Sequence, residues 1–141
     1  MKDMEGQVAE ARVLSSMLVD VSEQAKATFG SLAEAFGLPV HLARAIVLLA
    51  APMPMGDLAA QLACDRSYVT AIADQLKDRG LVDRIPGADR RVKLLSLTEK
   101  GTRLREELSQ AVAEGDLVMH RLDAAQRNAL LPLLEALLKK P

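Results

Sequence analysis

The chain has 141 residues, of which 50% are hydrophobic and 26% are charged, and its formal net charge is -1. This length and composition can bury the core of one ordinary domain. The chain lacks both the roughly 18 consecutive apolar residues of a membrane span and the basic and apolar regions of a signal peptide, so we expect a cytoplasmic protein without a membrane partner. The single cysteine, Cys64, excludes an intramolecular disulfide, and two histidines that are distant in sequence offer no metal-ligand spacing. We therefore expect no metal and no cofactor.

Charge is distributed unevenly along the chain. The segment from Arg66 to Lys93 contains seven basic and four acidic residues and has a net charge of +3, while the remainder has a net charge of -4. A local basic region on an acidic protein suits contact with a polyanion through one surface only. An ordinary solvated surface could show the same modest asymmetry, so the charge pattern alone does not indicate a polyanion partner.

The N-terminal part of the chain predicts two helices. Apolar residues recur there at steps of three or four, the period of one helix face, and indicate a long first helix that ends near Gly37. These residues are Leu14, Leu18, Val21, Ala25, Phe29, Leu32 and Phe36. Pro39 suits the first turn of a second helix, which should end at about Ala50 because Pro52 and Pro54 follow.

The next two elements predict a helix-turn-helix. A short helix is expected from about Gly56 to Ala63, with a turn at Cys64. Asp65 is a good N-cap for a second helix that reaches about Arg79, and Gly80 is a good residue to end it. Two helices joined by a tight turn form this motif.

A β-hairpin and two further helices should complete the chain. The runs LVDRI and VKLLSL are rich in branched and apolar residues and flank the turn-forming segment PGADRR. Thr98 should cap a continuous helix from about Glu99 to His120, and Asp123 with Gln126 resembles a capping box that opens the last helix. Pro132 should bend that last helix or delay its start.

This order predicts a mainly α protein with a small β-hairpin wing, that is, a winged helix-turn-helix flanked by terminal helices. We expect one domain, with the winged helix-turn-helix over residues 39–98 and dimerisation helices over 1–37 and 99–141. The terminal helices carry more apolar surface than the small middle region can cover. A second copy of the chain, with interleaved terminal helices, would cover it.

The helix from Asp65 to Arg79 has the features of a DNA recognition helix. Four apolar residues should face the core, and small or hydrogen-bonding residues occupy the outward face at the N-terminal end, which enters the major groove in this motif. The inward residues are Val69, Ile72, Ala73 and Leu76, and the outward ones are Ser67, Thr70, Ala71, Asp74, Gln75 and Asp78. Ser67 and the first-turn N–H groups can bind a phosphate, while Tyr68 and Thr70 can reach base edges.

The hairpin turn Asp89-Arg90-Arg91 is the second predicted DNA contact. A guanidinium at the tip can enter the narrow, negative minor groove, and a carboxylate two residues earlier can hold it extended. By itself such a tripeptide is common in turns. Its place directly after a helix-turn-helix favours a role in DNA binding.

A run of motifs in this region resembles the MarR (multiple antibiotic resistance regulator) family. The matching pieces are LAAQL, DRSYVT, ADQLKDRGLV, DRR and LSLTEKG, in the order of the family and near its spacing. Each piece is common, but their combination is specific. The helices on both sides also agree, so the resemblance covers nearly the whole chain.

The resemblance implies a winged helix-turn-helix homodimer that binds double-stranded DNA, usually a repressor of nearby genes that is released by small, often phenolic, ligands or by oxidation. It places Arg66, Ser67, Tyr68 and Thr70 on the recognition helix. It makes Arg91 the wing arginine and Asp89 its buttress, with Arg90 between them. The turn from Arg84 to Arg91 is about one residue shorter than is usual in the family.

The effector is less defined. Phe36 and His41 lie near the junction between the dimer helices and the DNA-binding region, where relatives bind ligands, although such a histidine is more often a boundary residue. Cys64 offers a thiol-based redox sensor as an alternative, but it lies in the turn rather than in the first helix, and a structural role is favoured. Met17, Met53, Met55 and Met119 could line an adaptable pocket, and core packing is the simpler expectation.

Two other functional classes are less consistent with the sequence than a DNA-binding regulator. The sequence has no phosphate-binding glycine loop, no HExxH motif and no nucleophile with a base, so we do not expect an enzyme. A dimeric winged-helix module that binds a protein partner instead of DNA remains an alternative. Ser67, Thr70, Asp89 and Arg91 disfavour it.

Overall fold

The computed structural model describes residues 2–139. The chain divides into two compact units. One, which we call the winged-helix unit, comprises residues 32–113; the other, the terminal unit, comprises the residues up to Ser31 together with those from Glu114 onward. Each is described by itself.

The first predicted helix is confirmed as α1 (Lys2–Ala35), whose last residues enter the winged-helix unit. Gly37 follows with φ +69°, a left-handed conformation that glycine adopts without steric cost, and the Leu38 N–H donates to the Ala33 carbonyl. α2 (Val40–Leu48) begins directly after Pro39. Its residues Leu42, Ala43, Ala45 and Ile46 are completely buried and fix the helix in the core.

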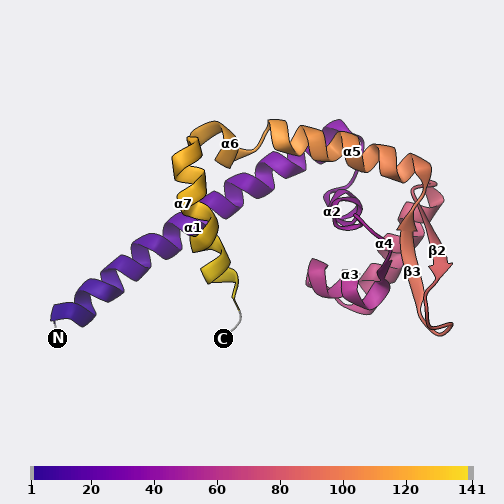
Figure 1. The fold of residues 1–141 in the computed structure, drawn as a ribbon, viewed down its shortest axis with the longest axis horizontal. Coiled ribbons are helices and arrows are strands. Elements are labelled where there is room, and N and C mark those ends of the chain that lie inside the picture. The colour runs from indigo at the N-terminus through magenta and orange to yellow at the C-terminus, as the bar shows by residue number, and fades with distance from the viewer. Residues whose placement is uncertain (1, 140–141) are drawn as a thin grey trace. The chain divides into compact units, whose positions relative to one another are not determined.

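The predicted helix-turn-helix is confirmed as α3 (Met55–Leu62) and α4 (Arg66–Asp78) (Figure 1). The turn between them places Ala63 at φ 53°, and the Asp65 carboxylate accepts a hydrogen bond from the Tyr68 N–H at 2.8 Å. The four apolar residues expected to face inward from α4 are indeed buried, and the six expected to face outward are exposed. The local sequence therefore fixes which face of α4 is available to a ligand.

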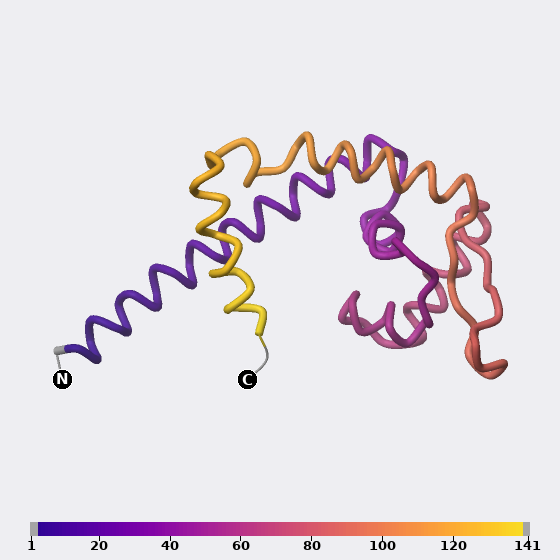
Figure 2. Tube along the Cα trace, in the orientation of Figure 1, coloured from indigo at the N-terminus to yellow at the C-terminus, as the bar shows by residue number. Residues whose placement is uncertain are grey.

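The wing is part of a three-stranded antiparallel sheet with the order β1-β3-β2. β2 (Val82–Pro86) and β3 (Lys93–Leu97) form the predicted hairpin, with Arg84 opposite Leu95, and lie side by side in the trace of Figure 2. β1 (Met53–Pro54) was not predicted, because two residues that include a proline show no alternation. It joins the segment before α3 to the hairpin.

α5 (Glu99–Glu114) begins, as predicted, directly after Thr98. The Thr98 hydroxyl accepts a hydrogen bond from the Gly101 N–H at 3.0 Å and donates to the Gly80 carbonyl at 2.7 Å, so one side chain ties α5 to the end of α4. Gly101 is buried, and a Cβ there would overlap with the Leu81 carbonyl oxygen. Only glycine allows this close approach.

The prediction of one continuous helix from Glu99 to His120 is wrong. Helix α5 stops at Glu114, and the short helix α6 (Leu117–Arg121) begins after Asp116, whose carboxylate accepts from the Val118 N–H at 2.7 Å and from the Met119 N–H at 3.2 Å. Gly115 and an N-capping aspartate interrupt the helix although the apolar spacing continues through them. In the terminal unit, Arg121 donates to the Gln24 side chain of α1 at 2.8 Å.

The last helix, α7 (Ala124–Leu138), begins with the predicted capping box of Asp123 and Gln126. Pro132 lies inside the helix, so the delayed start that we considered does not occur. The proline removes one backbone donor and leaves the Asn128 carbonyl without its usual helical partner.

Large apolar side chains are exposed on α1 and α7. On α1 they include Met4, Val8, Leu14, Met17, Leu18 and Val21, and on α7 Leu131, Leu133, Leu134, Leu137 and Leu138. Within residues 2–139 no single helix is long and apolar enough to cross a membrane, and only α1 and α2 taken together, bent by 97°, satisfy that test.

Candidate nucleic-acid interface

The N-terminal end of α4 presents the side chains that the sequence assigns to base contacts. Ser67, Tyr68 and Thr70 are all exposed, and 48% of the Tyr68 surface is accessible. The Thr70 hydroxyl donates to the Arg66 carbonyl at 3.0 Å, which leaves its oxygen able to accept a hydrogen bond from outside. Tyr68 is therefore the largest apolar group that this end of α4 offers to a partner.

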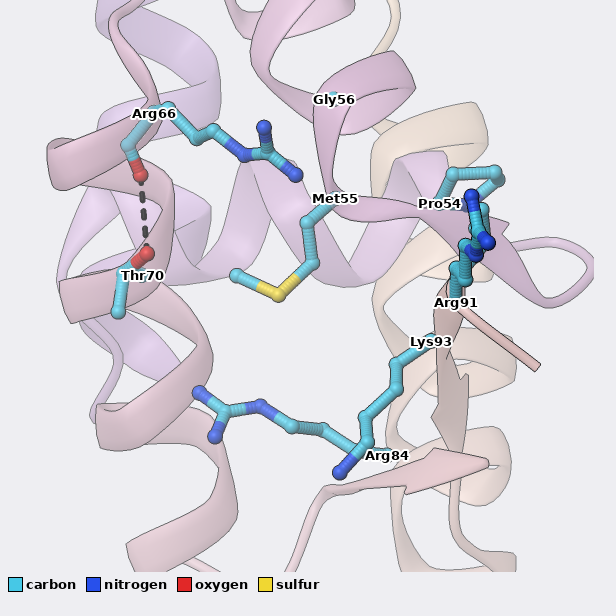
Figure 3. A pocket seen from close by; sticks show the side chains of 9 residues that line it. Pro54, Met55, Gly56, Arg66, Thr70, Arg84, Arg91 and Lys93 are labelled. Carbon is cyan, nitrogen blue, oxygen red and sulfur yellow. Dashed lines mark hydrogen bonds between the residues drawn. The ribbon is translucent and has the colours of Figure 1, made fainter. Parts of the chain in front are cut away.

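A groove of about 440 Å³ lies between α4 and the wing (Figure 3). The neutral part of its lining comes from Pro54, Met55 and Gly56 at the start of α3, from Thr70 and from Val92. Its cations are Arg66 of α4 and Arg84, Arg91 and Lys93 of the wing. In Figure 3 the Met55 side chain extends between those of Arg66 and Arg84. We call this feature the cationic groove.

Of the four cations in the cationic groove, two were predicted to contact DNA and two were missed by sequence reasoning. Arg66 and Arg91 were expected to contact DNA, whereas Arg84 and Lys93 were counted only in the regional charge. A signal was available, because the two residues flank the predicted hairpin turn and the pairing of β2 with β3 brings them close together. The exposed Arg90 is not part of the lining.

An ion pair links the wing to the recognition helix. The Arg84 Nη2 lies 2.7 Å from the Asp74 Oδ1, and the two side chains are 31% and 59% exposed. Solvent screens a pair of this kind, so its contribution to stability is about 0.2–1 kcal/mol. Its effect on geometry is more specific, because it holds one of the four groove cations against α4.

Hydrogen bonds within residues 87–92 define the wing tip. The Asp89 carboxylate accepts from the Arg91 N–H at 3.0 Å, the Asp89 carbonyl from the Val92 N–H at 3.0 Å, and the Val92 carbonyl from the Gly87 N–H at 2.9 Å. A Cβ at Gly87 would lie 2.8 Å from the Val92 carbonyl oxygen. The tip is thus a tight turn in which Asp89 acts on the main chain of Arg91, not on its guanidinium.

Phe36 and His41, the two residues predicted to contact an effector, lie directly after α1 and at the start of α2. Phe36 is half-buried beyond the end of α1, and His41 contacts the side chains of Gln75 and Tyr68 on α4. Neither residue lines the cationic groove or a second cavity of the winged-helix unit, of about 330 Å³. That second cavity is formed by residues 49–52, Ser96, Leu97, Thr102, Arg105 and Glu106.

Cys64 lies in the turn between α3 and α4, where its N–H donates to the Ala59 carbonyl at 3.1 Å. Its side chain is half-buried and its thiol is free. Among residues 2–139, no three histidine, cysteine, aspartate or glutamate side chains are grouped so that they could hold a metal ion.

Comparison with known proteins connects this geometry to a family. Residues 50–93 match the MarR family. Curated protein sequences contain no match to the chain. The matched segment comprises α3, α4 and the hairpin as far as the first residue of β3, which is the part of the chain that forms the cationic groove.

Solved structures share the fold over most of their length. A mutant of MarR from E. coli complexed with operator DNA is 22% identical with a TM-score of 0.73, and the match covers 92% of this chain and 96% of that one. CouR from Rhodococcus jostii RHA1, bound to p-coumaroyl-CoA, is 24% identical with a TM-score of 0.72, over 88% of this chain and 90% of that one. A transcriptional regulator of the MarR family from Rhodococcus sp. RHA1 is 23% identical with a TM-score of 0.74, over 90% and 93%.

At these identities the structural likeness establishes a shared fold. The match of residues 50–93 shows in addition that the helix-turn-helix and the wing resemble the family in sequence. The resemblance to the MarR family is thereby confirmed: the chain has the winged-helix fold of the MarR structures, and its residues 50–93 match that family.

Proposed function

We propose that this protein is a sequence-specific transcriptional regulator of the MarR type, which binds double-stranded DNA as a homodimer and represses genes until a small effector releases it. The observation that carries the proposal is the cationic groove beside the exposed N-terminal end of α4. A helix end that can enter the major groove and a basic wing beside it are the two parts that such docking needs.

Electrostatics support contact with DNA through this surface. Four cations from α4, β2, β3 and the wing tip gather in one groove on a chain whose formal net charge is -1. Phosphate attraction by such a cluster supplies non-specific affinity, and base contacts from α4 supply specificity. The residues outside 66–93 carry a net charge of -4, which disfavours contact with DNA elsewhere on the molecule.

The exposed apolar residues of α1 and α7 support the homodimer. Monomeric soluble proteins rarely expose large contiguous apolar surface, and a second copy of the chain would cover these helices. Two recognition helices would then read an inverted repeat whose half-site centres lie about 10 base pairs apart.

Release by an effector is supported by a solved structure of similar fold. CouR was solved bound to p-coumaroyl-CoA, which supports a ligand-responsive regulator, while a mutant of MarR was solved with operator DNA. Phe36 and His41 stay predictions for effector contact, and the cavity beside Arg105 is a second place to look.

Selection of bound fragments from genomic DNA tests the proposal. We expect enrichment of an inverted repeat with half-sites about one helical turn apart, confirmed by a mobility shift that random DNA of equal length does not give at the same protein concentration. A protein that binds no DNA, or an enriched site without two-fold symmetry, would contradict the proposed function. The genes next to the enriched sites would then indicate the class of effector.

A further inference from the structure

Three polar and aromatic side chains from α2 and α4 form a cluster outside the cationic groove. The His41 Nε2 lies 3.1 Å from the Gln75 Oε1, and the His41 ring centroid lies 6.1 Å from that of Tyr68, with an angle of 46° between the ring planes. These distances allow a hydrogen bond and a tilted ring contact. One residue of α2 thus contacts two residues of the outward face of α4.

Helix geometry places Tyr68 and Gln75 on the same stripe of α4. They are seven residues apart, which is nearly two full turns and about 10 Å along the axis. Ala71 lies between them on this stripe, and all three residues are exposed. The stripe continues the N-terminal end of α4 that we propose to enter the major groove.

The hydrogen bond has a defined direction. The Gln75 Oε1 faces the His41 Nε2, and an amide oxygen only accepts, so this arrangement uses the tautomer of His41 with its proton on Nε2. With its oxygen occupied, Gln75 presents its amide N–H groups outward, and these can donate to N7 or O6 of guanine, N7 of adenine or O4 of thymine. A glutamine without such an anchor could turn either end toward a base.

We propose that His41 is a positioning residue for the base-reading face of α4, which holds Gln75 by a hydrogen bond and Tyr68 by a ring contact and thereby helps to set the preferred DNA sequence. This inference rests on the proposed DNA binding. The fold does not depend on these contacts, because the buried residues Leu42, Ala43, Ala45 and Ile46 hold α2 in the core. His41 can therefore be replaced in a folded protein.

The contact with Tyr68 can be tested on the protein without DNA. The chain has one tyrosine and no tryptophan, so its tyrosine emission reports Tyr68 alone. Acrylamide quenching of this emission measures how accessible the Tyr68 ring is to solvent. We expect stronger quenching in His41→Ala, which removes the ring beside Tyr68, than in the wild type or in His120→Ala. Equal quenching in His41→Ala and the wild type would overturn the ring contact.

The effect on specificity needs variants that separate the two contacts. His41→Phe keeps a ring beside Tyr68 but removes the donor to Gln75. We expect discrimination at one base pair of the selected half-site to fall by about two- to tenfold, the range of one hydrogen bond, with little change in affinity for random DNA. Gln75→Ala should cause the same loss, and the double variant should lose no more. Val40→Ala, at the exposed neighbouring position of α2, is the matched control.

The outcomes distinguish this inference from the proposed function. Thermal unfolding first confirms that each variant is folded. If the wild type selects a defined site and His41→Phe selects it with an unchanged base profile, His41 has no positioning role and only this inference fails. If the wild type selects no site, the proposed function fails with it, whatever the tyrosine emission shows.

Discussion

Gly101 lies where α5 closely approaches Leu81, the residue that precedes β2. A Cβ at this position would overlap with the Leu81 carbonyl oxygen, which belongs to the main chain and cannot rotate away. We expect Gly101→Ala to lower the free energy of unfolding by about 1–3 kcal/mol, because overpacking outweighs the better helix propensity of alanine. Urea denaturation at a fixed protein concentration measures this change.

Gly6→Ala is the matched control for that substitution. Gly6 also lies inside a helix, but nothing approaches its missing Cβ within 4 Å. The same change should there raise the free energy of unfolding by about 0.5–1 kcal/mol. Equal effects at the two glycines would show that the close contact of Gly101 with Leu81 does not determine the change in the free energy of unfolding.

Tyr68, Thr70 and Arg91 should affect DNA binding in two different ways. Tyr68→Ala or Thr70→Ala should weaken binding to the selected site by about 1–3 kcal/mol and nearly spare random DNA, because both side chains lie at the exposed end of α4. Arg91→Ala should weaken both and lower the salt dependence by about one phosphate contact per subunit. Titrations at several salt concentrations on both DNAs distinguish these results. A uniform loss for Tyr68→Ala would place it at the phosphate backbone.

Asp89 should support DNA binding although it carries a negative charge. Its carboxylate accepts the Arg91 N–H at 3.0 Å, so its removal should loosen the wing tip. Asp89→Ala is expected to reproduce part of the loss caused by Arg91→Ala, whereas Asp89→Asn, which keeps an oxygen acceptor, should retain more affinity. Charge counting alone predicts tighter binding for both variants. If both bind more tightly across the salt series, Asp89 merely repels the DNA backbone.

At the level of the elements, the pair Arg84–Asp74 joins β2 to α4. We expect the two side chains to couple by only about 0.2–1 kcal/mol in a double-mutant cycle of unfolding, since solvent screens them. Asp74→Ala should at the same time tighten binding to random DNA, because Arg84 then gives its full charge to the cationic groove. Arg84→Ala should weaken that binding.

The double variant decides how Asp74 acts. If the carboxylate works by holding Arg84, Asp74→Ala should give little gain in a protein that already carries Arg84→Ala. An equal gain in both backgrounds would mean that Asp74 acts on DNA by its own charge and that the ion pair is irrelevant to binding. Thermal unfolding of all three variants checks that the wing remains folded.

For the whole molecule, we expect a stable homodimer. Light scattering at micromolar concentration should give about twice the chain mass of 15.2 kDa. The double substitution Leu14→Glu and Leu18→Glu adds two charges to the exposed apolar side of α1 and should shift the protein toward the monomer. A well-folded wild-type monomer would contradict the proposed mode of DNA binding.

Ser16→Glu is the control for the dimer variant. Ser16 lies between Arg12 and Asp20 at steps of four residues, on the polar side of the same helix, and is exposed. It adds charge to α1 without touching the apolar side. Dissociation by Ser16→Glu to the same extent would indicate that charge on α1, and not loss of an apolar interface, weakens the dimer.

The sequence by itself determined the features that depend on neighbours along the chain. The N-cap at Asp65, the inward and outward faces of α4, the capping box at Asp123 and the hairpin were all predicted, because caps and helix faces join residues three or four positions apart. The break at Gly115 had a local signal as well. It was overridden by an apolar spacing that continued across it.

Only the tertiary structure decided which distant side chains meet. Asp74 and Arg84 are 10 residues apart and His41 and Gln75 are 34 apart, and each pair forms only after the core has fixed two elements against each other. The two-residue strand β1 is likewise defined by its pairing with β3 and not by its own residues. Such contacts are set by how the chain closes its loops and packs its core, and no local periodicity in the sequence encodes that geometry.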